Sequence, residues 1–224
     1  MTAKKYKAVM FDLDGTLLDT LGDIHYSINL TMNKLGYAAH TKKEVRSFIN
    51  YGSKRLIELA LPEDKRDAET IEQTHKIYLE NYSKNVCIET KAYDGIQELV
   101  SRLKNEGYVL SVVSNKPHGQ VEQLCERFFG GMFSYVSGTG EDRPVKPQKE
   151  CILLALEQLG IDKDELVYVG DSNVDVKTAH NAGVVCAGVT WGFHGKGGFG
   201  DERADFYADN TAQLYSFITG EDYE

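Results

Sequence analysis

The sequence predicts an α/β protein in which helices cover both faces of a parallel sheet and a helical segment is inserted after the first strand. Short apolar runs alternate with amphipathic helical patterns through the C-terminal two-thirds of the chain. Such alternation is typical of strands joined by right-handed helical crossovers, which make the sheet parallel. The first apolar run is separated from the next by residues 12–108, far more than a simple crossover needs.

The strands are expected where apolar residues form short runs, because strands that are buried on both faces have this pattern. The runs are at residues 7–11, 109–113, 166–169 and 184–189, and residues 133–136 form a weaker candidate. Helical patterns between them cover about 94–106, 117–128, 148–160 and 173–182.

The long segment between the first two strands shows helical patterns and no comparable apolar run. These patterns cover about 20–35, 41–49, 53–61 and 63–84. We therefore expect a helical cap over residues 17–88, joined by two linkers to an α/β core that is formed by residues 1–16 and 89–224.

Composition excludes several classes of protein. The chain has 224 residues, 42% of them hydrophobic, and a formal charge of −9 from 25 basic and 34 acidic side chains. A surface of this sign disfavours nucleic acid and anionic lipid as partners, and any anion site on it must be locally positive. The apolar run at 8–11 is too short for a signal peptide, and no run has the length of a membrane-spanning helix, so we expect a cytoplasmic protein.

Two further features argue against other chemistries. The four cysteines lie far apart with no CxxC pair, so buried free thiols are expected in place of a zinc site or a redox dithiol. The glycine-rich run at 192–200 lacks the spacing of a nucleotide-binding P-loop and is expected to be an ordinary loop.

Four groups of polar residues lie at or just beyond the ends of predicted strands. Taken singly, each has an ordinary structural interpretation: an aspartate-rich turn, a helix N-cap, a solvated lysine, and aspartates that cap a helix. In an open parallel sheet, however, ligands bind at the carboxyl ends of the strands, where all four groups converge. The groups are Asp12-Leu13-Asp14-Gly15-Thr16, Ser114-Asn115-Lys116, Lys146 between Val145 and Pro147, and Gly170-Asp171-Ser172-Asn173-Val174-Asp175.

These four groups together resemble the motifs of the haloacid-dehalogenase-type hydrolases, whose core is a Rossmann-like sheet. The resemblance extends over nearly the whole chain, including the helical cap. Within that superfamily the chain is most similar to the phosphoglycolate phosphatase branch, through residues 49–53 in the cap and 188–193 near the C-terminus. One departure stands at Lys149, where members of the family usually have the second proline of a KPxP motif.

The resemblance implies a magnesium-dependent phosphatase that acts on a small phosphate monoester such as phosphoglycolate. It implies that Asp12 attacks phosphorus and forms an aspartyl-phosphate, and that Asp14 moves the protons. Expected catalytic residues are Asp12, Asp14, Ser114 and Lys146; expected substrate contacts are Gly15, Thr16, Ser53, Arg55, Ser114, Asn115 and Lys146. The expected Mg²⁺ ligands are Asp12, Asp14 through its backbone carbonyl, Asp171 and, directly or through water, Asp175.

A cation is also required by the charges alone. At an effective dielectric constant of about 20, like charges about 4 Å apart repel by about 4 kcal/mol per pair. Four carboxylates at one point therefore cannot hold a phosphate dianion unless a divalent cation binds both, and Mg²⁺ prefers oxygen ligands of this kind. An acid at position 14 further favours phosphate esters over halides, because a leaving alkoxide needs a proton and a leaving halide does not.

The cap is expected to close over the site and to select the leaving group. The segment around Gly52 is the candidate specificity loop, with Tyr51, Ser53, Lys54 and Arg55. Arg55 could bind a substrate carboxylate with two hydrogen bonds, or it could simply belong to a solvated helix start. The expected partner is a small phosphorylated metabolite, and the protein is expected to be a monomer or a homodimer.

Three other interpretations stay open at this stage. A phosphosugar mutase of the same fold would pass the phosphoryl group to a second hydroxyl. A phosphonate-cleaving relative would need a cap lysine, for which Lys54 is the candidate. A non-catalytic regulatory module would merely be phosphorylated at Asp12, although such modules carry no helical insert after the first strand.

Overall fold

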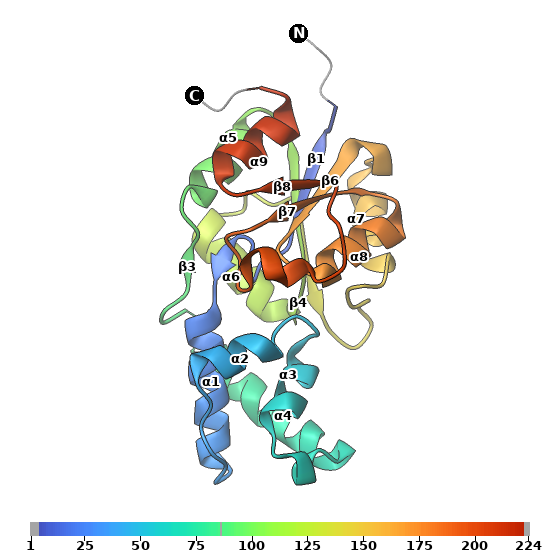
Figure 1. Ribbon diagram of the computed structural model, residues 1–224. Coiled ribbons are helices and arrows are strands. Elements are labelled where there is room, and N and C mark those ends of the chain that lie inside the picture. The colour runs from blue at the N-terminus through green and yellow to red at the C-terminus, as the bar shows by residue number, and fades with distance from the viewer. Residues whose placement is uncertain (1–4, 86, 222–224) are drawn as a thin grey trace.

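The computed structural model describes residues 5–85 and 87–221. It contains a six-stranded sheet in the order β5–β4–β1–β6–β7–β8, in which every neighbouring pair is parallel (Figure 1). The expected α/β fold class with a parallel sheet is confirmed. The strands are β1 (Ala8–Phe11), β4 (Val109–Pro117), β5 (Tyr135–Thr139), β6 (Leu166–Gly170), β7 (Val185–Val189) and β8 (Phe206–Ala208).

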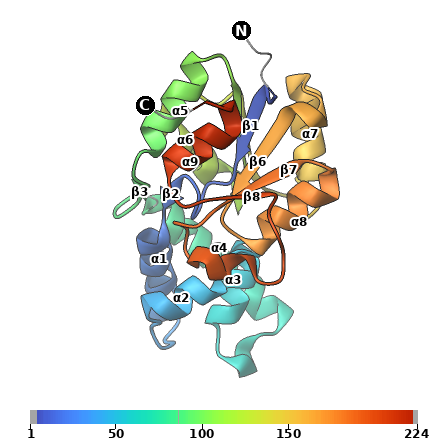
Figure 2. The same ribbon diagram turned by 45° about the horizontal axis from the view of Figure 1, so that its top comes forward.

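The central strand β1 is buried on both faces by helices. Val9 and Phe11 pack in a core with residues of α5, α6 and α9, whereas Ala8 and Met10 pack in a second core with residues of α7 and α8. Successive side chains of a strand point to opposite faces, so four apolar residues in a row serve both cores. Figure 2 shows the two helical layers: α5 (Ile96–Asn105), α6 (His118–Phe129) and α9 (Thr211–Thr219), then α7 (Glu150–Leu159) and α8 (Asn173–Ala182).

The register of the sheet brings polar segments together at one edge. Phe11, the last residue of β1, pairs with Val112 of β4 on one side and with Val169 of β6 on the other. The ladder continues one step further, because the Asp12 amide donates to the Val169 carbonyl at 2.9 Å. Residues that follow these three strands therefore emerge side by side.

The cap helices lie together beyond the carboxyl ends of these strands (Figure 1). A two-stranded antiparallel ribbon of β2 (Leu18–Asp19) and β3 (Lys91–Ala92) joins them to the core. None of the helices in the described residues is both long and apolar enough to cross a membrane. The cap helices are α1 (Leu21–Lys34), α2 (Lys42–Phe48), α3 (Ser53–Ala60) and α4 (Ala68–Lys84).

A buried carboxylate fastens the two linkers to each other. Asp23, in the first turn of α1, is fully buried. It accepts hydrogen bonds from the backbone amides of Ile88, Glu89 and Thr90 at 2.7–3.2 Å and from the Thr90 hydroxyl. One side chain at the start of the cap therefore satisfies three amides at its end, which fixes how the chain leaves and re-enters the core.

We expect Asp23→Ala to lower the free energy of unfolding by about 3 kcal/mol or more, because it removes a buried charged acceptor shared by three backbone amides and a hydroxyl. Denaturant unfolding followed by circular dichroism measures this loss. The control is Asp64→Ala, since Asp64 is exposed and pairs only with the neighbouring exposed Lys65 among the contacts described, and it should change stability by no more than about 0.5 kcal/mol. A loss below 1 kcal/mol for Asp23→Ala would mean that other contacts hold the linkers.

Some of the expected boundaries were wrong. The helix expected from residue 117 begins at His118, because β4 continues to Pro117. The helix expected at 63–84 is a short 3₁₀ turn, Glu63–Lys65, followed by α4, which begins where the Asp67 side chain accepts from the Thr70 amide. The strand expected at 133–136 is β5, which begins two residues later. Neither β8 nor α9 was expected.

Candidate active site

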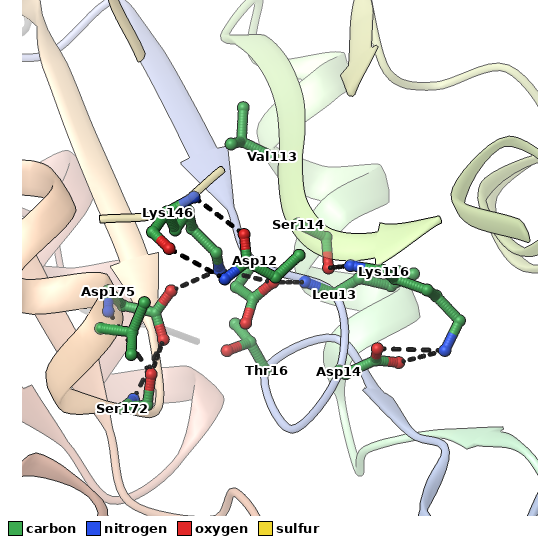
Figure 3. A network of polar contacts seen from close by, with 12 residues as sticks. Asp12, Leu13, Asp14, Thr16, Val113, Ser114, Lys116, Lys146, Ser172 and Asp175 are labelled. Atoms are coloured by element: carbon green, nitrogen blue, oxygen red, sulfur yellow. Dashed lines mark hydrogen bonds and ion pairs between the residues drawn. The ribbon is translucent and has the colours of Figure 1, made fainter. Parts of the chain in front are cut away.

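Asp12 occupies the first position beyond β1, at the centre of the sheet edge. Its side chain is almost entirely buried. Oδ1 accepts a hydrogen bond from the Leu13 amide at 2.7 Å and lies 2.9 Å from the Lys146 Nζ. These two contacts fix the orientation of the carboxylate (Figure 3).

Lys146 is buried and held from two directions. Its Nζ lies 2.9 Å from Asp12 Oδ1 and donates to Asp175 Oδ1 at 2.7 Å and to the Tyr168 hydroxyl at 3.2 Å. Its backbone is held by Asn115, whose Oδ1 accepts from the Lys146 amide and whose Nδ2 donates to the Lys146 carbonyl. Asn115, which was expected to contact substrate, lines the cavity between core and cap, and its side-chain amide holds the backbone of Lys146.

Three carboxylates meet beside this lysine. Oxygen atoms of Asp12, Asp171 and Asp175 lie within 4.8 Å of one another, and all three residues are buried. Burial raises the pKa of Asp12 to about 7, with Lys146 opposing the shift and Asp175 adding to it. Burial also raises the pKa of Asp171 well above its ordinary value, reinforced by Asp175 and Asp12. One ammonium does not balance three buried carboxylates, so the donor set fits a divalent cation with oxygen ligands.

Asp175 is the carboxylate with the least room for a metal ion. Its Oδ1 accepts from Lys146 and from Tyr168, while its Oδ2 accepts from the amide and the hydroxyl of Ser172. A carboxylate has about four acceptor positions, and these four donors fill them. Asp12 and Asp171 are therefore the side chains best placed to receive a cation, and Asp175 is suited to hold Lys146 and the start of α8.

Glycines surround Asp171 closely. A Cβ atom at Gly15, whose φ is +86°, or at Gly192 would collide with the Asp171 carboxylate. The segment that contains Gly192 also secures the first motif, since the Trp191 Nε1 donates to the Thr16 carbonyl at 3.0 Å and the Phe193 amide donates to Asp171 Oδ2 at 3.2 Å. The space that these glycines leave is what allows a carboxylate to reach the cluster.

If a divalent cation is supplied as Mg²⁺ to this cluster, we expect Gly192→Ala to bind it roughly 10- to 100-fold more weakly than the wild type, the cost typical of disturbing a metal ligand's surroundings. The added methyl group would push Asp171 out of place. The control is Gly197→Ala in the same segment, because a Cβ there meets nothing within 4 Å. Titration of each variant with Mg²⁺, read out by thermal stability, separates the two. Equal affinities in both variants would show that Asp171 does not depend on this close packing.

Ser114, Gly15 and Thr16 all lie at this edge. Ser114 is buried within β4, where its hydroxyl accepts from the Lys116 amide at 3.3 Å. It is not a helix cap, because α6 begins after Pro117. The Thr16 hydroxyl donates to Asp171 at 3.5 Å, and the positive φ of Gly15 lets the chain turn back over the cluster. The structure thus brings together the residues that the sequence placed at strand ends.

Asp14 has a partner that sequence reasoning missed. Its two carboxylate oxygens accept from the Lys116 Nζ at 2.9 and 3.0 Å (Figure 3). The Thr20 hydroxyl donates to its Oδ1 at 2.7 Å. Lys116 is two residues beyond Ser114 near the carboxyl end of β4, and both residues line the same cavity. That spacing is the sequence signal that could have identified it.

A cavity of about 60 Å³ lies between the sheet edge and the cap. Asn115 also bridges this junction, donating to the carbonyl of Asn50 in the cap at 3.2 Å. The cavity is lined on the core side by Asp12, Asp14, Ser114, Asn115, Lys116, Pro117, Lys146 and Ser172, and on the cap side by Ile24, Ile49, Asn50, Gly52, Ser53, Leu56, Tyr78 and Tyr82.

The expected specificity loop is only partly at this cavity. Ser53 lines it, with its hydroxyl 2.8 Å from His75 Nε2. Arg55 does not line it, and its guanidinium pairs with Glu58 one helical turn away at 2.5 Å. On a helix, residues two apart point in different directions, so Ser53 and Arg55 do not both face the site.

Comparisons with known proteins agree with this geometry. Residues 9–189 match the family model for haloacid dehalogenase-like hydrolases. The phosphoglycolate phosphatase of Haemophilus influenzae is 30% identical over 222 residues, which cover 96% of this chain and 99% of that protein. A solved structure of a proposed phosphoglycolate phosphatase from Lactobacillus delbrueckii subsp. bulgaricus has a TM-score of 0.89 at 28% identity, over 97% of this chain and all of that one.

The same fold occurs in a proposed β-phosphoglucomutase from Bacteroides vulgatus, with a TM-score of 0.76 over 96% of this chain and 88% of that one. Its identity is 20%, so this likeness concerns the fold alone.

The chain belongs to the haloacid dehalogenase-like hydrolases. It is a phosphoric monoester hydrolase, and among the members of its family it resembles the phosphoglycolate phosphatases.

Proposed function

We propose that this enzyme is a Mg²⁺-dependent phosphatase that hydrolyses small phosphate monoesters through an aspartyl-phosphate on Asp12. The observation that carries the proposal is the buried cluster of Asp12, Asp171 and Asp175 around a single lysine at the end of the central strand. Phosphoglycolate is the leading substrate, because proteins named for that activity are about 30% identical over nearly the full length of the chain.

The proposed reaction has two steps. Asp12 attacks phosphorus, a bond forms between its carboxylate and phosphorus, and the ester oxygen leaves with a proton from Asp14. Asp14 then takes a proton from a water molecule, which attacks the aspartyl-phosphate and releases inorganic phosphate together with the restored Asp12 carboxylate. Lys146 offsets the charge of Asp12 and of the phosphoryl group throughout, and Ser114 with nearby amides orients the phosphoryl oxygens.

Mg²⁺ would be held by Asp12, Asp171 and the backbone carbonyl of Asp14. Asp175 would contact the ion only through water. When bound, the ion supplies positive charge that lets a phosphate dianion approach these carboxylates. In this proposal the core, residues 1–16 and 89–224, carries the catalytic residues. The cap, residues 17–88, selects the leaving group. The substrate partner is then a small phosphorylated metabolite.

A panel of phosphate esters tests this proposal, with and without Mg²⁺. Inorganic phosphate should be released from phosphoglycolate and other two- or three-carbon esters with Mg²⁺, and EDTA should abolish release. Mg²⁺ should also raise the melting temperature of the wild type and not that of Asp171→Asn, because a ligand that binds the folded state stabilises it.

The panel also separates the rivals. Transfer of phosphate between two positions of a phosphosugar, without steady release, would point to a mutase of the same fold. Phosphorylation of Asp12 by acetyl phosphate without turnover of p-nitrophenyl phosphate would point to a regulatory module.

A further inference from the structure

Lys116 is a buried cation that the proposed reaction does not use. The residue is 5% exposed, and it lines the cavity between core and cap. Its Nζ lies 4.6 Å from the centre of the Tyr82 ring, which belongs to α4 of the cap. Burial of an ammonium is costly unless an anion accompanies it. In this structure the accompanying anion is the carboxylate of Asp14, bound through both of its oxygens.

Asp14 cannot serve Lys116 and the reaction at the same time. Its Oδ1 also accepts from Thr20 in the linker, so Lys116 and Thr20 together hold the carboxylate. To protonate the ester oxygen that leaves the phosphoryl group at Asp12, Asp14 must give up these contacts. Lys116 would then be left buried without an anion, a state that costs free energy.

The other cations near the cavity already have partners. Lys146, which also lines it, is held by Asp12 and Asp175. In the cap, Lys54 pairs with Glu72, while Arg55 pairs with Glu58. Apolar and aromatic side chains of Ile24, Leu56, Tyr78 and Tyr82 line the cap side of the cavity. Lys116 is therefore the cation that a second negative group on a substrate would meet there.

We propose that Lys116 binds a carboxylate on the leaving-group half of the substrate, and that this carboxylate replaces Asp14 as its counterion and releases Asp14 for proton transfer. The inference rests on the proposed phosphatase function and adds the residue that would select phosphorylated small hydroxy acids over esters without a carboxylate. A substrate without the carboxylate leaves Asp14 bound to Lys116. The substrate carboxylate therefore affects kcat as well as binding.

The test compares phosphoglycolate with ethyl phosphate, which lacks the carboxylate, in the wild type and in Lys116→Met. Loss of a charged hydrogen bond should lower the kcat/KM ratio of phosphoglycolate to ethyl phosphate by roughly 10- to 150-fold. The ratio of the two kcat values should also approach one. The control is Lys76→Met in the cap, since Lys76 is exposed and lies beside Glu72 one helical turn away, and it should keep the wild-type ratios.

Each outcome decides something different. A parallel fall for both esters in Lys116→Met would overturn the inference, because a purely structural lysine affects both alike. Absence of phosphate release from either ester by the wild type would overturn the proposed function, and this inference with it. Glycolate and glycolamide provide a second measurement on the wild type alone. Glycolate should inhibit hydrolysis of ethyl phosphate at least roughly 10-fold more strongly than glycolamide, which lacks the carboxylate. Equal inhibition by the two compounds would also overturn the inference.

Discussion

The Asp12→Asn variant should lose phosphate release by about 10,000-fold or more while it keeps the native fold. The large loss is expected because an amide cannot form the aspartyl-phosphate, and removal of a catalytic nucleophile costs at least this much in other enzymes. The fold should survive because the substitution keeps the volume and removes one of three buried carboxylates. Burial, with Asp175 adding to it, raises the pKa of Asp12, so the native structure does not depend on this charge. Lys146 retains Asp175 as its counterion.

Steady-state phosphate release and thermal unfolding measure the two halves of this prediction. Mass spectrometry after rapid acid quench should find a phosphorylated peptide containing Asp12 in the wild type and none in the variant. The control is Asp201→Asn, an exposed aspartate far along the chain, which should leave both rate and stability close to wild type. A variant at position 12 with more than about one hundredth of the wild-type rate would require another nucleophile.

The Asp14→Asn variant should lose about 100- to 10,000-fold in turnover of alkyl phosphates, the range typical of a lost acid–base group. The expected loss differs between the two steps. The p-nitrophenolate group leaves without a proton, so formation of the aspartyl-phosphate should remain fast with that ester. Its hydrolysis still needs a base, so the intermediate should accumulate. Rapid mixing with p-nitrophenyl phosphate should therefore show a burst of about one p-nitrophenolate per enzyme, followed by slow turnover.

The structure also shows what must be controlled in that experiment. Asp14 is the carboxylate that accompanies buried Lys116, so its replacement lowers stability as well as activity. The melting temperature of the variant is measured first, and the assay is run well below it. Thr20→Val is the matched control, because it removes the 2.7 Å hydrogen bond to Asp14 and leaves the carboxylate in place. If Asp14→Asn showed no burst and slowed both esters equally, Asp14 would not be the proton carrier.

The parts of the site that the sequence predicted are those placed by the sheet itself. Asp12 follows an uninterrupted apolar run, and Asp171 follows another; parallel pairing of those two runs puts their ends side by side. The sequence placed both residues at the carboxyl edge, which every strand of a parallel sheet shares, and the neighbouring positions of β1 and β6 then bring them together. Ser114 was placed at the edge for the same reason, and it lies within β4, which continues to Pro117.

The parts that the sequence left undecided depend on contacts between distant segments. Asn115 lines the cavity, and its side-chain amide also holds the backbone of Lys146, 31 residues away. Arg55 was expected at the cavity, but it lies on another side of α3, where it pairs with Glu58. Both outcomes depend on how one element is turned against another, which periodicity within a single segment does not fix.

The sequence by itself determined the elements and the edge at which chemistry is expected, because apolar periodicity, strand ends and turn glycines are local properties of the chain. Only the tertiary structure decided which donors each carboxylate has. In the folded protein Asp175 accepts from four donors, Asp14 forms an ion pair with Lys116, and Asp23 accepts from three amides of the opposite linker. The physical reason is that a hydrogen bond or an ion pair requires distances near 3 Å, and residues far apart in sequence reach such distances only when the packing of whole elements is set.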